Sequence, residues 1–293
     1  MTAHLYICNS TFKWNGTDGF DEFKAKMADF QFMLENIIEH KEDNLLYIYM
    51  DSLLSTMLLP NVTFANILDY DYAIKTIGKD CYIILMGMIK HRQPTEATLK
   101  DIREYLSYED EDNCHGIVVF PKARKRNSHI QVMSTVEGWL NFRRHYLGKY
   151  PKNAQFFLGE LNKFFPALRI HPNSKQTIKE VLDSHSLRIV ECLSALNDYF
   201  IEEFMNCGMD IVHFLPHFAG SHSIDDASLE GNKDDRFKFT FDENGVTTTA
   251  YCEAHLKMYR DNSNNAAQHC RIYFRKPEPG DSVVYVGYIG RHL

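Results

Sequence analysis

A change of hydrophobic period near the end of the chain most constrains its fold. Phe237, Phe239 and Phe241 alternate with polar neighbours, which is the pattern of a strand with one buried face. The Asn-Gly pair at 244–245 supplies the positive φ angles of a tight hairpin turn. Three more strands are expected to complete a four-stranded antiparallel meander, at 246–260, 270–275 and 283–289.

The hydrophobic pattern of the preceding part of the chain predicts helices mixed with short buried strands. From 20 to 38, apolar residues recur at the spacing of a helix with one buried face. They are Phe20, Phe23, Met27, Phe30, Leu34, Ile37 and Ile38. Apolar runs at 45–50 and 117–120 predict strands, and other segments predict helices, among them 95–106, 134–147, 153–165 and 187–205.

These hydrophobic patterns predict an α+β chain in three parts. Residues 1–207 are expected to form a helix-rich, mixed α/β module that senses a signal or binds a partner. Residues 208–235 contain Pro216, Gly220 and Gly231 among polar residues, so we interpret them as a linker or functional loop. Residues 236–293 are expected to be the β-meander and to act as the effector.

Composition excludes several classes of protein. The 293 residues are 44% hydrophobic and 24% charged, which is typical of a folded globular chain. No apolar run approaches the roughly 20 residues that cross a bilayer, and the first residues lack the features of a signal peptide. The seven cysteines form no Cys-x-x-Cys pair, which indicates free thiols in a reducing compartment. We therefore predict a cytoplasmic protein with no membrane partner.

Motifs for cofactors and metals are missing from the sequence. It contains no GxxxxGK[ST] or GxGxxG phosphate loop and no GxSxG nucleophile turn. His213, His217 and His222 approach the spacing of a zinc site, but Pro216 is expected to interrupt a helix there. The sequence therefore predicts no cofactor and no metal site.

Strand alternation gathers polar residues on one face of the predicted meander. One strand projects Glu253, His255, Lys257 and Tyr259 to the same side, and the next projects Arg271, Tyr273 and Arg275. The tail after the last strand carries His292, which can fold over this face. Residues 251–293 hold six Lys and Arg against four Asp and Glu, although the whole chain has a charge of −7. The end of the chain is therefore locally basic.

This set of side chains is suited to cleaving RNA without a metal ion. The reaction needs a base, an acid and cations that stabilise the phosphorane. The candidate catalytic residues are His255, Lys257, Arg271, Tyr273 and His292. The alternative is an ordinary solvent-facing sheet with cross-strand charge pairs.

A second basic group lies earlier in the chain. Further candidates for gripping a nucleic-acid backbone, together with Arg275, are Lys122, Arg124, Lys125, Arg126, Arg143 and Arg144. The alternative interpretation of the segment 122–126 is a solvated charged turn.

Three segments carry a resemblance to known proteins: AHLKMYR (254–260), CRIYF (270–274) and VYVGYIGRHL (284–293). They resemble the C-terminal block of uncharacterised bacterial proteins associated with toxin–antitoxin and anti-phage defence loci. Helices followed by a meander with R-I-Y-F are also similar to RelE/HigB-type ribonuclease toxins. This resemblance covers about a fifth of the chain and implies a metal-independent ribonuclease fold that uses Lys, Arg, Tyr or His on the sheet.

Our leading hypothesis is a bacterial defence- or toxin-associated effector that acts on RNA and can have a protein partner or antitoxin. One alternative is a non-enzymatic subunit of a defence complex that binds nucleic acid or protein through the same face. Another is a metal-dependent nuclease whose site lies in the N-terminal module, at Asp51 or the acidic run 109–112.

Overall fold

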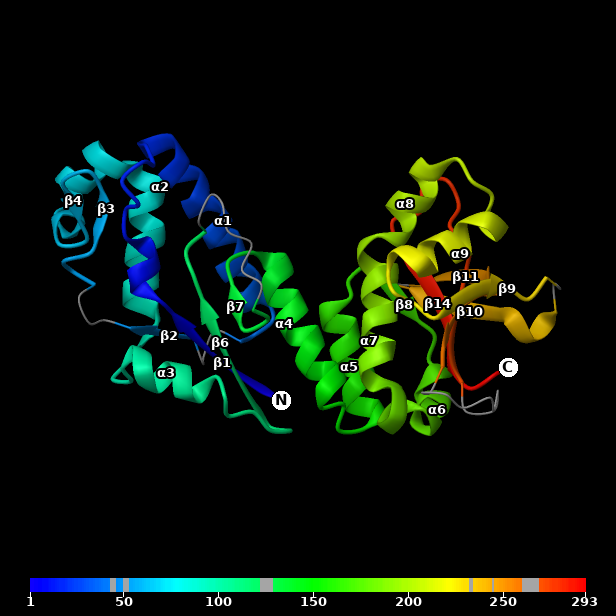
Figure 1. Ribbon diagram of the computed structural model, residues 1–293. Coiled ribbons are helices and arrows are strands. Elements are labelled where there is room, and N and C mark those ends of the chain that lie inside the picture. The colour runs from blue at the N-terminus through cyan, green and yellow to red at the C-terminus, as the bar shows by residue number, and fades with distance from the viewer. Residues whose placement is uncertain (43–45, 50–52, 122–128, 232–233, 244, 260–268) are drawn as a thin grey trace. The chain divides into compact units, whose positions relative to one another are not determined.

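The computed structural model describes residues 1–42, 46–49, 53–121, 129–231, 234–243, 245–259 and 269–293 (Figure 1). Helices make up 48% and strands 22% of it, which confirms the α+β class. Contacts divide the chain into two compact units, Met1–Arg143 and Arg144–Leu293. The division falls within helix α4 (Val136–Lys149), whereas the segment predicted to lie between modules was 208–235.

The first unit is built on a parallel sheet of five strands in the order β5-β2-β1-β6-β7. These strands are β1 (Thr2–Ile7), β2 (Leu46–Tyr49), β5 (Gln93–Thr95), β6 (Asn113–Val118) and β7 (Val132–Met133). In chain order the arrangement is 3-2-1-4-5, in which the chain reverses direction across the sheet between β1 and β6. This parallel sheet is in keeping with the mixed α/β character predicted for the N-terminal part of the chain.

Helices connect the parallel strands of this unit. They are α1 (Phe20–Glu39), α2 (Tyr70–His91) and the short α3 (Leu99–Tyr105). Helices α1 and α2 contact each other on one side of the sheet, and α3 lies on the other side (Figure 1). Helix α2 is kinked at Gly78, whose φ of +77° lies outside the helical region. The unit also contains η1 (Asn9–Phe12), η3 (Asn66–Leu68) and a small hairpin of β3 (Met57–Leu59) and β4 (Val62–Thr63).

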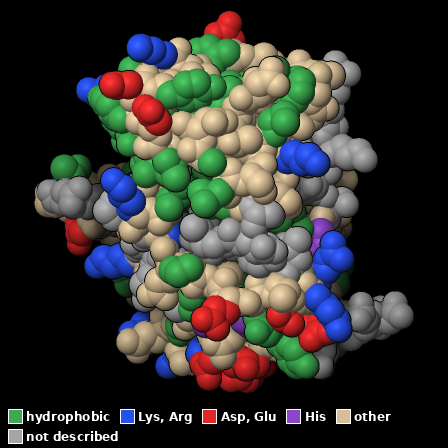
Figure 2. All heavy atoms as spheres, turned by 90° about the vertical axis from the view of Figure 1, so that its left-hand side faces the viewer, with side chains coloured by type: hydrophobic (Ala, Val, Ile, Leu, Met, Phe, Trp, Pro, Cys, Tyr) green, Lys and Arg blue, Asp and Glu red, His purple; other side chains and the backbone are tan. Residues whose placement is uncertain are grey.

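Part of the surface of the first unit is apolar. Figure 2 looks onto the side that carries the β3–β4 hairpin and α2, where hydrophobic side chains recur between polar and charged ones. Exposed apolar residues in these elements and the segments beside them include Leu54, Met57, Leu68 and Ile83. Among the described residues, no helix combines the length and the apolar character needed to span a membrane.

The second unit contains a five-stranded mixed sheet in the order β8-β14-β13-β12-β9. Its strands are β8 (Leu168–Ile170), β9 (Asp226–Leu229), β12 (Ala254–Met258), β13 (Cys270–Phe274) and β14 (Val284–Gly290). Strand β8 pairs with β14 in parallel, and the other neighbours are antiparallel. The predicted four-stranded antiparallel meander is therefore wrong. Strands β8 and β9 have only three and four residues, too few to show a clear period in the sequence.

The predicted hairpin exists but lies outside this sheet. Strands β10 (Lys238–Glu243) and β11 (Val246–Tyr251) pair only with each other, and Gly245 in their turn has a φ of +85°. The single strand predicted at 246–260 is divided at 252–253 into β11 and β12. The Phe239 ring lies directly on Gly287 of β14, where a Cβ atom would come within 2.3 Å of it. The hairpin therefore covers part of one face of the five-stranded sheet.

Helices cover the opposite face of this sheet. They include α7 (Leu182–Asp198), α8 (Phe200–Cys207) and α9 (Ile211–Ser221), and Phe200 packs edge-on against Phe274 of β13 at 4.9 Å. Helix α5 (Ala154–Phe164) and the short turns α6 (Ser174–Thr177), η4 (Ile178–Glu180) and η5 (Asp235–Phe237) complete the unit.

The segment 208–235, predicted as a linker or loop, holds regular structure instead. Helix α9 begins after Asp210, whose carboxylate caps the helix by accepting the N–H of His213. It continues through Pro216, so the expectation that this proline interrupts a helix is wrong. Strand β9 follows and joins the edge of the sheet beside β12. Pro216, Gly220 and Gly231 among polar residues made these two elements hard to predict from the sequence.

Candidate functional site

The candidate site is the polar face of strands β9, β12 and β13. Strand pairing places His255 directly opposite Tyr273, and Lys257 directly opposite Arg271. On the other side of β12, His255 faces Ser228 of β9. Four of the residues that alternation assigned to one face, His255, Lys257, Arg271 and Tyr273, therefore do lie together. They are joined by strand β9, which was not predicted from the sequence.

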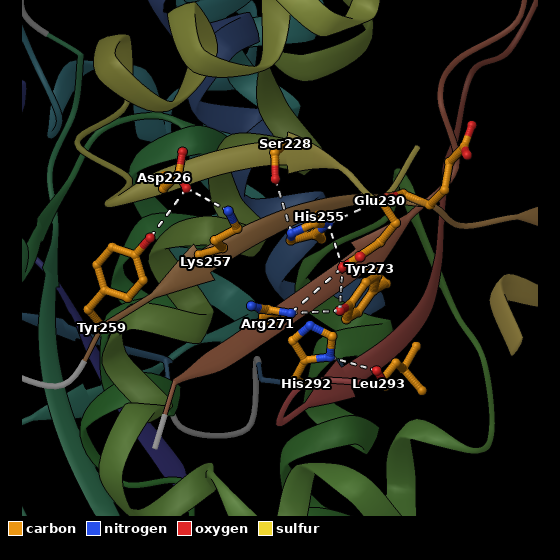
Figure 3. Close-up of polar contacts among 11 residues, drawn as sticks. Asp226, Ser228, Glu230, His255, Lys257, Tyr259, Arg271, Tyr273, His292 and Leu293 are labelled. Atoms are coloured by element: carbon orange, nitrogen blue, oxygen red, sulfur yellow. Dashed lines mark hydrogen bonds and ion pairs between the residues drawn. The ribbon is translucent and has the colours of Figure 1, made fainter. Parts of the chain in front are cut away.

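Polar contacts link Ser228, His255, Glu230, Tyr273 and Arg271 into one network, and Asp226 joins Lys257 and Tyr259 in a second group beside it (Figure 3). The Nε2 atom of His255 is 3.2 Å from the Ser228 hydroxyl, and its Nδ1 atom is 3.6 Å from Oε1 of Glu230. The Tyr273 hydroxyl donates to the same Glu230 oxygen at 3.0 Å. Arg271 donates to the Tyr273 hydroxyl at 3.2 Å and lies 3.7 Å from Glu230. Glu230 is thus the common partner of three side chains.

Burial divides this network into a closed part and a reachable part. His255 is 2% exposed, and Tyr273 is fully buried beneath Phe237, whose ring stacks on it at 5.6 Å. Ser228 is half-buried at the edge strand. The expectation that the polar face is displayed to solvent therefore fails for His255 and Tyr273, because η5 and the β10–β11 hairpin pack over that end.

Burial also sets the protonation of the closed part. It lowers the pKa of His255 to about 4, and the nearby charges of Arg271 and Lys257 act in the same direction. The imidazole is therefore neutral at pH 7. Burial likewise raises the pKa of Tyr273 above its ordinary value, so the phenol keeps its proton.

Lys257 and Tyr259 share a carboxylate at the more open end of the face. Lys257 donates to Asp226 at 2.7 Å, and the Tyr259 hydroxyl donates to the same carboxylate at 3.3 Å. Burial alone would raise the pKa of Asp226, but the hydrogen bond and charge of Lys257 hold it below its usual range. Tyr259 itself is exposed.

Asp226, Ser228 and Glu230, on the β9 side of the site, were not predicted from the sequence. The signal was present, since the segment reads D-A-S-L-E and alternates polar with apolar residues. Ala227 is indeed buried on the opposite face. Asp226 and Glu230 supply the two carboxylates of these contacts, and Ser228 supplies the aliphatic hydroxyl.

The polar partners described for His292 and Arg275 are outside the network. The Nδ1 atom of His292 is 2.6 Å from the carbonyl oxygen of Leu293, and the residue is exposed. Arg275 pairs with Asp281 at 2.5 Å and stacks over Tyr285. Within the described part of the chain, no hydrogen bond or ion pair joins either residue to Ser228, His255 or Glu230.

Arg143 and Arg144 are buried structural residues, so their predicted role in binding nucleic acid is corrected. They are 4% and 2% exposed. Arg143 pairs with Glu42 at 2.9 Å, and Arg144 holds Asp198 with a 2.6 Å contact. Neighbouring positions on a helix point in different directions, which explains why each arginine enters a different unit.

The other predicted nucleic-acid residues, Lys122, Arg124, Lys125 and Arg126, lie outside the described residues, as does Asp51. In the acidic run 109–112, Asp110 accepts hydrogen bonds from the backbone of Asp112 and Asn113 and so closes a turn. The described ranges contain no group of three or more His, Cys, Asp or Glu suited to holding a metal ion.

Comparison of the chain with protein-family models, with curated proteins and with solved structures found no match.

Proposed function

We propose that the second unit is a defence- or toxin-associated effector that cleaves RNA without a metal ion. The observation that carries this proposal is the Nε–H group of Arg271, which is buried and has no acceptor among the described residues. A buried donor without an acceptor costs about 1–3 kcal/mol, which an anionic ligand would recover. Arg271 lies opposite Lys257, so a phosphate at this position would meet two cations.

The neighbouring groups supply the remaining chemistry of the proposal. His255 is neutral at pH 7 because burial lowers its pKa, so it is able to accept a proton. Tyr273 keeps its proton and holds the guanidinium of Arg271 in place. The resemblance of the C-terminal segments to defence-associated proteins and RelE/HigB-type toxins supports RNA as the substrate.

A second candidate function is non-enzymatic binding of nucleic acid or protein. It is favoured by the pairing of each cation on the face with a carboxylate. Asp226 holds Lys257 at 2.7 Å, and Glu230 lies 3.7 Å from Arg271. A phosphate therefore has to displace at least one carboxylate before it gains the full attraction of either cation.

The test is incubation of the full chain with RNA in the presence of EDTA. We expect cleavage that falls about a hundredfold or more in Arg271→Ala, as for removal of a donor to a developing negative charge. Lys179→Ala, an exposed charge change in η4, is the matched control and should cleave normally. His292→Ala tests the tail, which was assigned a catalytic role from sequence.

The outcomes separate the two candidates. RNA binding without cleavage, weakened in Arg271→Ala but not in Lys179→Ala, would replace the first function by the second. Equal cleavage by the wild type, Arg271→Ala and His292→Ala would refute the assignment of the site. If the protein neither binds nor cleaves RNA, both functions are refuted.

A further inference from the structure

The contact between Ser228 and His255 has the geometry of a nucleophile and its base. The Ser228 hydroxyl is 3.2 Å from Nε2 of His255. On the other side of the ring, Nδ1 lies 3.4 Å from the backbone carbonyl oxygen of Glu253 and 3.6 Å from the carboxylate of Glu230. A nucleophilic hydroxyl needs a base within hydrogen-bond reach and a third group that orients the base.

The hydrogen-bond partners fix the tautomer of His255. Both neighbours of Nδ1, the Glu253 carbonyl and the Glu230 carboxylate, can only accept, so the proton of the neutral ring belongs on Nδ1. Nε2 then has a lone pair, and the hydroxyl of Ser228 is the donor. The proton that His255 is placed to accept is therefore the serine proton.

The solvent exposure of these residues also favours the Ser228 hydroxyl as the group that meets the substrate. His255 is 2% exposed, so its ring cannot reach the 2′-hydroxyl of an RNA strand in this conformation. Ser228 is half-buried on an edge strand that pairs on one side only. A substrate can therefore approach the serine hydroxyl first. The oxygens on a phosphorus atom bonded to the Ser228 oxygen then come next to Nε2 of His255, which lies 3.2 Å from that oxygen.

Glu230 is itself held in place. The Tyr273 hydroxyl donates to its Oε1 atom at 3.0 Å, and Arg271 lies 3.7 Å away. We regard Glu230 as a positioning residue, because it contacts the imidazole. The charges of Arg271 and Lys257 act on the ring together with that of Glu230.

We infer that Ser228 is the nucleophile of the site and attacks a phosphodiester. This substrate class rests on the proposed function. The Ser228 oxygen forms a bond to phosphorus while its proton passes to Nε2 of His255. The bond to the 5′-oxygen then breaks, and that oxygen takes the proton from His255, which leaves a phosphoserine diester.

Water completes the reaction by the reverse transfers. His255 accepts a proton from water, the hydroxide attacks phosphorus, and the Ser228 oxygen departs and regains a proton from His255. The products are a 3′-phosphate and a 5′-hydroxyl. Because no 2′-hydroxyl takes part, single-stranded DNA should be cleaved as well as RNA.

The first test uses a fluorophosphonate probe on the full chain, followed by peptide mass spectrometry. The serine oxygen displaces fluoride from phosphorus, so we expect label on Ser228 that is lost in Ser228→Ala. Ser184→Ala is the matched control, because Ser184 also contacts a histidine, His185, at 2.8 Å. It should leave the labelling unchanged. Failure to label Ser228 in the wild type would overturn the inference.

Glu230→Gln tests the positioning role. We expect labelling at least about tenfold slower at pH 7, because the ring loses its orienting charge. The pH–rate midpoint should also move to lower pH, since the Glu230 charge favours the protonated ring. An unchanged rate and an unchanged midpoint would overturn the role of Glu230.

The second test compares an RNA oligonucleotide with its all-deoxy counterpart in EDTA. Cleavage of both, with 3′-phosphate ends and loss in Ser228→Ala, would support the inference. Cleavage of RNA alone with 2′,3′-cyclic phosphate ends would overturn it but keep the proposed function. Labelling of Ser228 with cleavage of neither strand would overturn the phosphodiester substrate and the proposed function together.

Discussion

Acidification should destabilise the second unit through His255. Burial lowers the pKa of this residue from 6.5 to about 4 in the folded protein. Below pH 6.5 His255 binds a proton in the unfolded chain, whereas in the folded chain it does so only near pH 4. The contribution to stability is therefore complete above pH 6.5 and is lost as the pH falls toward 4. At about 1.4 kcal/mol per unit, the loss between pH 7 and pH 4.5 is about 2 kcal/mol.

The matched variant is His255→Gln, whose amide can still donate toward Glu230 and accept from Ser228 but does not titrate. Hydrogen exchange of the β12 and β13 peptides, corrected for intrinsic rates, measures the opening free energy of this unit alone. Other histidines with lowered pKa values remain in both proteins, so their contributions cancel in the difference.

We expect the wild type to lose about 2 kcal/mol more than His255→Gln between the two pH values. Equal losses would mean that the folded protein accommodates the charged imidazole, and the description of His255 as a buried neutral base would be refuted. A larger loss in His255→Gln would refute the sign of the argument.

Two further predictions concern packing and thiol chemistry. Gly287→Ala should destabilise the second unit by about 1–3 kcal/mol, because the new methyl group meets the Phe239 ring. In Gly159→Ala the new methyl group lies in an exposed helical position with no atom within 4 Å, so this variant should instead stabilise the unit by about 0.5–1 kcal/mol. Urea unfolding of both variants measures these changes in stability. Burial raises the pKa of Cys252 to about 12, so at pH 8 a thiol reagent should modify the half-buried Cys207 and leave Cys252 intact, as peptide mapping will reveal.

Local periodicity predicted the first long helix well. The structure places α1 at Phe20–Glu39, against the expected 20–38, and buries Phe23, Met27 and Phe30. Phe20 and Ile38, at the two ends of the predicted stripe, are 40% and 42% exposed. A helix buries its stripe where another element covers it, and sequence spacing alone does not say how far that cover extends.

The sheet of the second unit was only partly predictable, because its edges depend on distant pairing. Strand β8 pairs with β14 across more than a hundred residues, and β9 is separated from β12 by the whole hairpin. Neither short strand has a turn signal that ties it to its neighbour. The strands linked by local alternation, β12 and β13, were placed with the correct shared face.

Alternation predicted which site residues meet but not which are buried. The period of two puts His255 and Tyr273 on one face whatever covers that face. Their burial results from Phe237 and the hairpin, which fold back from an adjacent segment. The burial of Arg143 and Arg144 was likewise not predictable. Two adjacent cations indicate a surface patch unless their carboxylate partners, here Glu42 and Asp198, are known.

Strand β9 also changes what the charge of this face means. The excess of cations in residues 251–293 suggested a basic surface, but β9 lies outside that segment and sets Asp226 against Lys257 and Glu230 beside Arg271. These two pairs cancel in net charge. An anionic substrate therefore gains little from long-range attraction and depends on short contacts such as the Nε–H group of Arg271. Under the proposed function, recognition should rest on geometry at Ser228 and Arg271 rather than on a basic patch.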